Sequence, residues 1–127
     1  MIDHVSVETA DLARATAFYD AALGAIGYTR LVTREATAGY GKGYPEFWIN
    51  RRDGAGALPG SGFHVALRCK DADTVRAFHE AALSNGGACD GVPELRPEYA
   101  DVYYAAFIRD PDGNRIEAVT FLKADKT

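Results

Sequence analysis

The stretch Gly62-Phe63-His64-Val65-Ala66-Leu67-Arg68-Cys69 is the key to the architecture, because it repeats the start of the chain. It has the composition of a β-strand, carries one histidine, and follows a segment rich in Gly. A displacement of 60 residues places residues 1–27 on residues 61–87 without a gap. His4 then matches His64, and Asp, Phe and Gly positions also match at this offset. We infer that the chain contains two copies of one structural unit.

The length and composition are those of one soluble globular domain. The chain has 127 residues, of which 47% are hydrophobic and 25% charged. A net charge of −4 gives no basic footprint for nucleic acid. We find neither a targeting segment nor an apolar run long enough to cross a membrane, and Cys69 and Cys89 are too few for a disulfide framework. We expect a cytoplasmic protein that binds neither nucleic acid nor membrane.

Hydrophobic periodicity predicts that each copy consists of a strand, a helix and about three antiparallel strands. Module one is expected over residues 1–53, a linker over 54–61 and module two over 62–122. In module one, strands are predicted over 2–8, 28–34, 37–41 and 46–50, with a helix over 12–23. In module two, strands are predicted over 63–69, 102–109 and 115–122, with a helix over 72–83 and irregular chain over 88–101.

Local signals support the two helices and the last turn. The segment Thr9-Ala10-Asp11 offers caps for the first helix and Asp71 is a predicted cap of the second, while Asp110-Pro111-Asp112-Gly113 is a strong turn sequence. The predicted apolar stripe of the second helix consists of Val75, Phe78, Ala82 and Leu83. These elements predict an α+β fold of two paired βαβββ modules that form a cupped mixed sheet with the helices outside.

The repeat and the strand parity single out two histidines and two glutamates. His4 and His64 are equivalent by the offset, and the alignment of residues 45–48 on residues 116–119 makes Glu46 equivalent to Glu117. If the halves pack around a two-fold axis, all four side chains face the concavity between them. Two imidazoles and two carboxylates that converge on one point form a divalent-metal site.

These residues give the chain a resemblance to a known superfamily. His4 in the first strand, Phe63-His64-Val65 and the run Asp110-Pro111-Asp112-Gly113-Asn114-Arg115-Ile116-Glu117 resemble the vicinal oxygen chelate superfamily over nearly the whole chain. That superfamily includes glyoxalase I, extradiol dioxygenases, fosfomycin-resistance thiol transferases and metal-free bleomycin-binding proteins. The resemblance implies paired βαβββ modules, a metal in a cupped sheet and a homodimer.

The resemblance leaves two ligand sets open. Glyoxalase I members use two His and two Glu, a set that His4, Glu46, His64 and Glu117 would supply. Dioxygenases of the superfamily use two His and one Glu, which His4, His64 and Glu117 would satisfy. The implied cofactor is a divalent metal ion, namely Fe, Ni, Co, Zn or Mn.

The substrate side of the predicted site depends on the geometry of the last hairpin. If a glycine bulge places Phe107 opposite Glu117, then Tyr103, Ala105 and Phe107 face the metal. A tighter two-residue turn would instead direct Tyr104 and Ala106 inward. Three further candidates for substrate binding are Trp48 on the face of Glu46, and Arg96 and Tyr99 in a loop able to close over the cup.

Two functions from different classes follow. The first is a metal-dependent enzyme, namely a lyase, isomerase or dioxygenase. The metal would hold two adjacent substrate oxygens. In the isomerase version, Glu117 or Glu46 is the general base. The second is a metal-free protein that binds a small aromatic or cationic molecule, suggested by the aromatic side chains and the negative net charge. His79, on the second helix, is expected to be structural.

Overall fold

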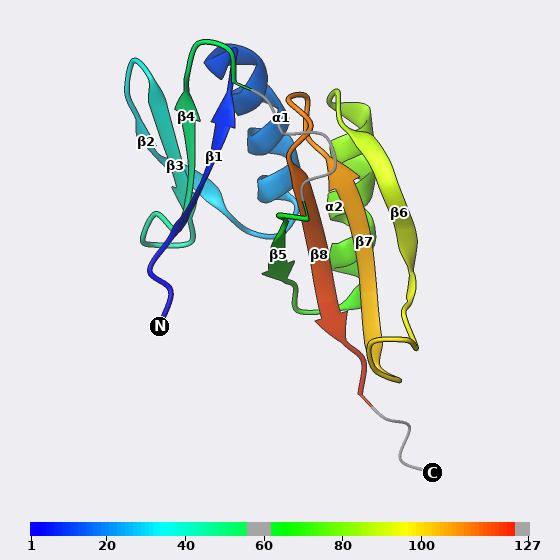
Figure 1. Cartoon of the computed structure of the whole chain (residues 1–127). Coiled ribbons are helices and arrows are strands. Elements are labelled where there is room, and N and C mark those ends of the chain that lie inside the picture. Colours follow the sequence, from blue (N-terminus) through cyan, green and yellow to red (C-terminus); the bar gives the residue numbers. More distant parts are fainter. Residues whose placement is uncertain (56–61, 124–127) are drawn as a thin grey trace.

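Each half of the chain folds into a four-stranded mixed sheet with one helix packed against it (Figure 1). The computed structural model describes residues 1–55 and 62–123, so most of the predicted linker lies outside the described residues. The elements of the first half are β1 (Val5–Thr9), α1 (Leu12–Gly24), β2 (Thr29–Thr33), β3 (Thr37–Gly41) and β4 (Phe47–Arg51). Those of the second half are β5 (Val65–Arg68), α2 (Ala72–Ser84), β6 (Ala88–Leu95), β7 (Tyr103–Arg109) and β8 (Arg115–Phe121).

The two sheets have the same topology. The strand order is β1-β4-β3-β2 in the first sheet and β5-β8-β7-β6 in the second. In both, the strand before the helix pairs in parallel with the last strand of the half, and the remaining pairs are antiparallel. The expected α+β fold of two βαβββ modules is therefore confirmed.

Strand β6 was not expected, because the sequence predicted irregular chain over residues 88–101. It pairs with β7 through two register shifts, one between Cys89 and Gly91 and one between Gly91 and Glu94. Pro93 lacks an amide donor and is tolerated because β6 is an edge strand. The bulges and the proline remove the period-two alternation by which a strand is recognised in a sequence.

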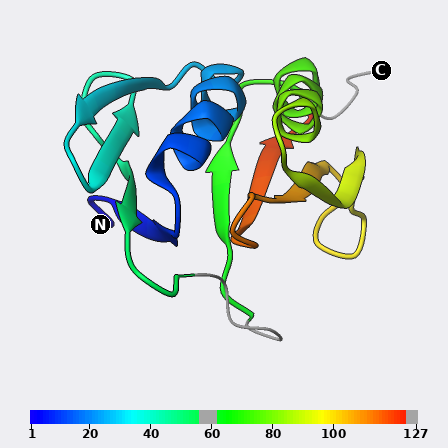
Figure 2. The same ribbon diagram turned by 90° about the horizontal axis from the view of Figure 1, so that it is seen from above.

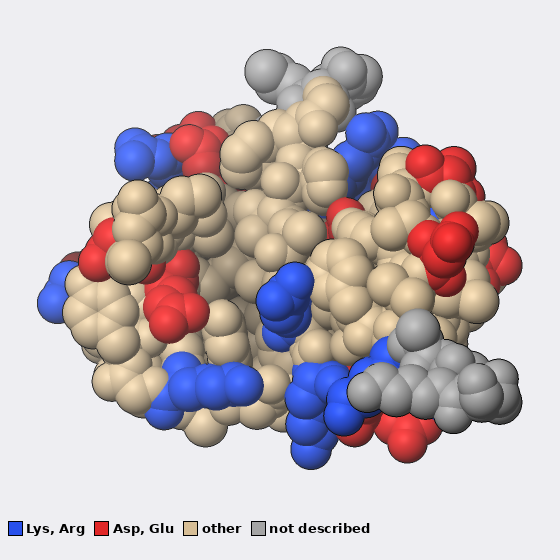
Figure 3. Space-filling view, turned by 90° about the horizontal axis from the view of Figure 1, so that it is seen from below, with Lys and Arg blue, Asp and Glu red and all other residues tan. Residues whose placement is uncertain are grey.

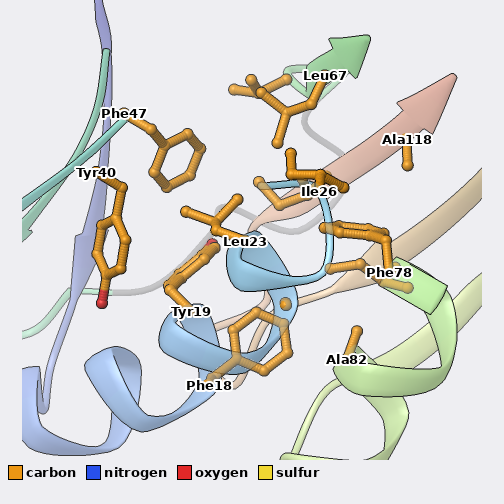
Figure 4. Close-up of a cluster of buried hydrophobic side chains, with 14 of the residues drawn as sticks. Phe18, Tyr19, Leu23, Ile26, Tyr40, Phe47, Leu67, Phe78, Ala82 and Ala118 are labelled. Carbon is orange, nitrogen blue, oxygen red and sulfur yellow. The ribbon is translucent and has the colours of Figure 1, made fainter. Parts of the chain in front are cut away.

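A single hydrophobic core joins the two modules (Figure 4). Seen from above, α1 and α2 lie next to each other, α1 beside the first sheet and α2 over the second (Figure 2). Phe18, Leu23 and Phe78 are fully buried between them and the sheets. Leu83, expected on the buried stripe of α2, is instead 42% exposed. The described part of the chain contains no helix that could span a membrane.

Both predicted helix caps are present. The Asp11 carboxylate accepts a hydrogen bond from the Arg14 amide (3.1 Å), and the Asp71 carboxylate accepts one from the Thr74 amide (2.8 Å). Each satisfies one of the amides that a helix leaves unpaired at its start.

The turn before β8 binds the start of α1 and so connects the modules. The Asp112 side chain is 2% exposed. It accepts hydrogen bonds from the Thr9 hydroxyl (2.6 Å), the Ala10 amide (2.9 Å) and Arg14 Nη2 (2.8 Å). The predicted turn is thus also the polar contact between the two halves.

A second buried carboxylate of this turn is held from both modules. Asp110 accepts hydrogen bonds from the hydroxyl of Tyr19 in α1 (2.6 Å) and from the side-chain amide of Asn114 (2.8 Å). Burial raises the pKa of Asp110 despite these bonds, and it also raises the pKa of Tyr19. The hydroxyl of Tyr19 therefore stays protonated and donates its hydrogen bond to Asp110 in the core.

Candidate metal centre

The face of the second sheet opposite α2 carries the clearest pair of metal-ligand side chains. His64 directly precedes β5, and Glu117 lies in the neighbouring parallel strand β8, paired with Ala66. The distance from His64 Nε2 to Glu117 Oε1 is 3.1 Å. The Glu117 side chain is 3% exposed and that of His64 is 46% exposed, so the pair combines a buried carboxylate with an accessible imidazole.

Strand β7 supplies the side chains next to this pair. Phe107 is the register partner of Glu117, so of the two hairpin geometries that the sequence left open, the one with Tyr103, Ala105 and Phe107 on the face of Glu117 is observed. The Tyr103 hydroxyl donates to Glu117 Oε2, while the rings of Phe107 and His64 are 6.5 Å apart. Burial, followed by the contact with Glu117, raises the pKa of Tyr103 to about 12. Each carboxylate oxygen of Glu117 therefore has one hydrogen-bonding partner, His64 at Oε1 and Tyr103 at Oε2.

Aromatic rings continue from Tyr103 along the same face. Tyr99 and Phe121 each make an edge contact with the Tyr103 ring, at centroid distances of 5.2 and 5.3 Å. The guanidinium of Arg68 lies 4.6 Å from the centre of the Phe121 ring. Arg68 and Phe121 were not predicted, although alternation from His64 and from Glu117 places them on this face. The result is an apolar, aromatic surface beside the donor pair.

Arg96 lies at the other side of the pair. Its guanidinium is 5.2 Å from the centre of the Phe107 ring, and its two terminal nitrogens donate to Glu94 (3.0 Å) and to the Val92 carbonyl (2.6 Å). Nε is buried without a partner among the described residues. The arginine predicted to contact substrate is thus largely engaged within its own loop.

In the first module, His4 has a carboxylate partner. Its Nδ1 lies 2.7 Å from Asp3 Oδ1, and this contact, with one from Tyr44, lowers the pKa of Asp3. An ionised carboxylate only accepts hydrogen bonds, so Nδ1 is the donor in this contact and Nε2 is the ring nitrogen that remains for another partner. Carboxylates orient metal-binding histidines in this way, but here both side chains are more than half exposed. Asp3 was not predicted.

Glu46 lies beside the start of β1, since the Val5 amide donates to its carbonyl at 2.9 Å. Its carboxylate accepts a hydrogen bond from the Tyr28 hydroxyl at 2.9 Å. Burial and then this bond raise the pKa of Tyr28 to about 12. Tyr28, which packs against the core, was not predicted as a partner.

The register of the sheets corrects the expected equivalence of Glu46 and Glu117. Glu117 pairs with Ala66, whereas the residue that pairs with Ser6, the counterpart of Ala66, is Trp48. Trp48 therefore occupies the position of Glu117, two residues from the expected one. A displacement of two residues leaves each side chain on the same face, so strand parity does not reveal the error. The indole packs over Gly39, where a Cβ would lie 2.8 Å from the ring.

The structure brings His64 and Glu117 together but keeps them apart from His4 and Glu46. Within residues 1–55 and 62–123, no three His, Cys, Asp or Glu side chains are grouped so that they could hold a metal ion. The four side chains therefore do not converge within the described part of one chain. The reason lies in the topology, because no strand ladder joins the two sheets in the described part of the chain.

Charged side chains are unevenly spread over the face seen from below. Lys and Arg gather toward the lower centre of this view, while Asp and Glu lie mostly toward its two sides (Figure 3).

The chain was compared with known proteins at the level of sequence and structure. The family model of the Glyoxalase/Bleomycin resistance protein/Dioxygenase superfamily matches residues 1–118. A glyoxalase/bleomycin resistance protein from Albidiferax ferrireducens T118 is 32% identical, with a TM-score of 0.83 over 93% of this chain and 97% of that one. No curated protein gave a match.

More distant structures share the fold. A glyoxalase/bleomycin resistance protein/dioxygenase family enzyme from Burkholderia phytofirmans PsJN is 18% identical, with a TM-score of 0.75 over 95% of this chain and 98% of that one. A glyoxalase I mutant from Zea mays is 22% identical, with a TM-score of 0.73 over 92% of this chain and 45% of that one.

The paired βαβββ modules define the class of the protein, and the family model extends over nearly all of its length. The chain belongs to the Glyoxalase/Bleomycin resistance protein/Dioxygenase superfamily.

Proposed function

We propose that the protein is a divalent-metal-dependent enzyme of the glyoxalase or dioxygenase type that acts on a small molecule. The observation that carries this proposal is the pair of His64 and Glu117, whose donor atoms are 3.1 Å apart on an open sheet face. Two neighbouring ligands of an octahedral metal, each about 2.1 Å from it, lie about 3 Å apart. The pair therefore fits one edge of a coordination sphere for Fe, Ni, Co, Zn or Mn.

We assign His4 as the third ligand and a second copy of the chain as its source. His4 has the orienting carboxylate of a metal ligand, but it lies on the first sheet, away from His64 and Glu117. In a two-fold symmetric homodimer, the first sheet of one copy faces the second sheet of the other, and two equivalent sites result. Such a dimer supplies each site with two histidines and one glutamate.

When bound, the metal supplies Lewis-acid chemistry toward two adjacent oxygens of the substrate. The chain contributes the positioning. Tyr103 and His64 hold Glu117 from either side, and the aromatic surface of Tyr99, Tyr103 and Phe107, together with Trp48 of the first sheet, excludes water from an apolar substrate. Arg96 lies against the Phe107 ring beside this surface, and it would contact a substrate only by exchanging its hydrogen bonds to Glu94 and Val92.

The two free cysteines fit a reducing, cytoplasmic setting for this enzyme, because disulfides are rare there.

Metal titration tests the proposal directly. The protein stripped with a chelator should bind one divalent ion per chain, and His64→Ala should lose this binding, as followed by calorimetry. The two-histidine, one-carboxylate set is that of non-haem iron(II) oxygenases, so oxygen consumption with Fe(II) and candidate vicinal diols is the first activity to measure. Wild-type protein that binds no divalent ion would contradict the proposal.

Glu46 decides between the two ligand sets. Because Trp48 occupies the position equivalent to Glu117, we expect Glu46→Gln to leave metal affinity unchanged. His4→Ala should weaken binding by about 100-fold or more, the upper end of the losses found at metal sites. The measurement is the dissociation constant of one metal in both variants. A matching loss in Glu46→Gln would make Glu46 a fourth ligand and would favour the isomerase, with Glu46 or Glu117 as general base.

A metal-free binding protein is the second candidate, and the aromatic surface around Tyr103 is the observation in its favour. Such a surface, with Arg68 over Phe121 at its end, stacks on planar ligands without a metal. Stabilisation of the chelated double variant His64→Ala, Glu117→Ala by a planar aromatic cation would support this function. Stabilisation only in the presence of metal would support the enzyme.

A further inference from the structure

A cysteine–histidine pair lies outside the candidate metal centre. His79 of α2 and Cys89 of β6 face each other, with Nε2 and Sγ 3.2 Å apart. Cys89 pairs with Ile108, which is buried on the helix side of the sheet. The pair is therefore on the face opposite His64 and Glu117, and it is independent of the proposed function.

We propose that Cys89, with His79 as its base, is a reactive thiol that exchanges reversibly with small disulfides. A thiol reacts as its thiolate, and a histidine within hydrogen-bond distance is the arrangement that generates the thiolate in cysteine nucleophiles. Cys89 is exposed, so a small disulfide has access to the sulfur. Burial lowers the pKa of His79, which leaves its imidazole neutral near pH 7 and able to accept the thiol proton.

The other cysteine provides an internal reference. Cys69 is buried, its Sγ contacts the Leu67 carbonyl at 3.8 Å, and no imidazole contact to its sulfur is recorded in the described part of the chain. Burial raises the pKa of Cys69 to about 11. One chain thus contains an accessible thiol with a base and a buried thiol that is expected to be inert.

The exchange balances without a further oxidant. His79 takes the proton from Cys89, and the thiolate attacks one sulfur of the disulfide. A new S–S bond forms to Cys89, the original S–S bond breaks, and the departing thiolate takes the proton back from His79. Cys89 is oxidised to a mixed disulfide while the other half of the reagent is reduced to a free thiol. A second thiol reverses the step.

Reaction with dithiodipyridine, followed by the absorbance of the released thione, tests the proposal. We expect one fast thiol per chain in the wild type. Cys89→Ser should remove the fast phase and Cys69→Ser should leave it unchanged. His79→Gln, which keeps the size but not the basicity of the side chain, should slow it by about 10-fold, at the low end of what a positioned base contributes.

His79→Ala separates the base from simple shielding. This change opens the space around the sulfur, so a thiol that was only shielded would react faster, whereas a thiol that has lost its base reacts more slowly. Equal rates in wild type, His79→Gln and His79→Ala would overturn the proposal, as would a fast phase that survives Cys89→Ser. Thermal melting of each variant confirms that the rates refer to folded protein.

Discussion

Heterodimers that combine a His4→Ala chain with a Glu117→Gln chain should bind divalent metal, although neither variant does so by itself. Loss of one ligand should weaken binding by about 100-fold or more in each homodimer, the upper end of losses at metal sites. In the heterodimer, the intact His4 of one copy meets the intact His64 and Glu117 of the other. About half of the wild-type sites should therefore return. Two affinity tags allow purification of the heterodimer, and calorimetry counts the sites.

The control is a heterodimer of two variants whose substitutions both lie on the second sheet. His64→Ala and Glu117→Gln both damage the second sheet, so each site of their heterodimer contains one defect and no binding should return. Recovery in this control, or no recovery in the first mixture, would show that the site is not shared between copies. A protein that stays monomeric at high concentration would also contradict the shared site.

Asp112→Ala should lower the free energy of unfolding by about 1–3 kcal/mol, since it removes a buried carboxylate that accepts from a hydroxyl and an amide; the Thr9 hydroxyl retains only the Asp11 carbonyl at 3.0 Å as an acceptor. Thr9 and Ala10 donate to this carboxylate from the first module, so the loss affects the contact between the modules. The lost ion pair with Arg14 should contribute little to this decrease in the free energy of unfolding, because the Arg14 side chain is 48% exposed and the pair is screened by water. Urea unfolding followed by circular dichroism measures the change.

Asp73→Ala is the comparison for this variant. Asp73 also pairs with an arginine, but its side chain is 86% exposed, and exposed pairs contribute little. Its free energy of unfolding should remain close to that of the wild type. Equal stability of the Asp112 and Asp73 variants would mean that the turn before β8 does not connect the modules energetically.

The features that sequence reasoning predicted correctly are those encoded by local pattern. The 60-residue repeat, the caps at Asp11 and Asp71 and the turn at Asp110-Pro111-Asp112-Gly113 all depend on neighbouring residues or on alternation along a strand. Leu83 departs from its counterpart Leu23, which is fully buried, because burial depends on what packs against a helix and not on its own periodicity.

The features that sequence reasoning missed depend on contacts between elements. The alternation of side chains along a strand places Glu46 and Trp48 on one face of the sheet. It does not fix which of the two aligns with Glu117, since both alignments keep the same alternation. The separation of the two half-sites follows from how the sheets are placed around a shared core, and no local signal reports that placement. Strand β6, which begins at Ala88, was not recognised because its bulges and Pro93 interrupt the alternation.

The contact between Thr9 and Asp112 also has a consequence for the order of folding. These residues are 103 positions apart in the chain, so during synthesis the start of α1 emerges long before the carboxylate that binds it. Contacts so distant in sequence require closure of a long loop and form slowly. The contact between the modules can therefore close only after residue 112 has been made, and until then the apolar side chains of α1 that pack in the shared core lack part of their partners.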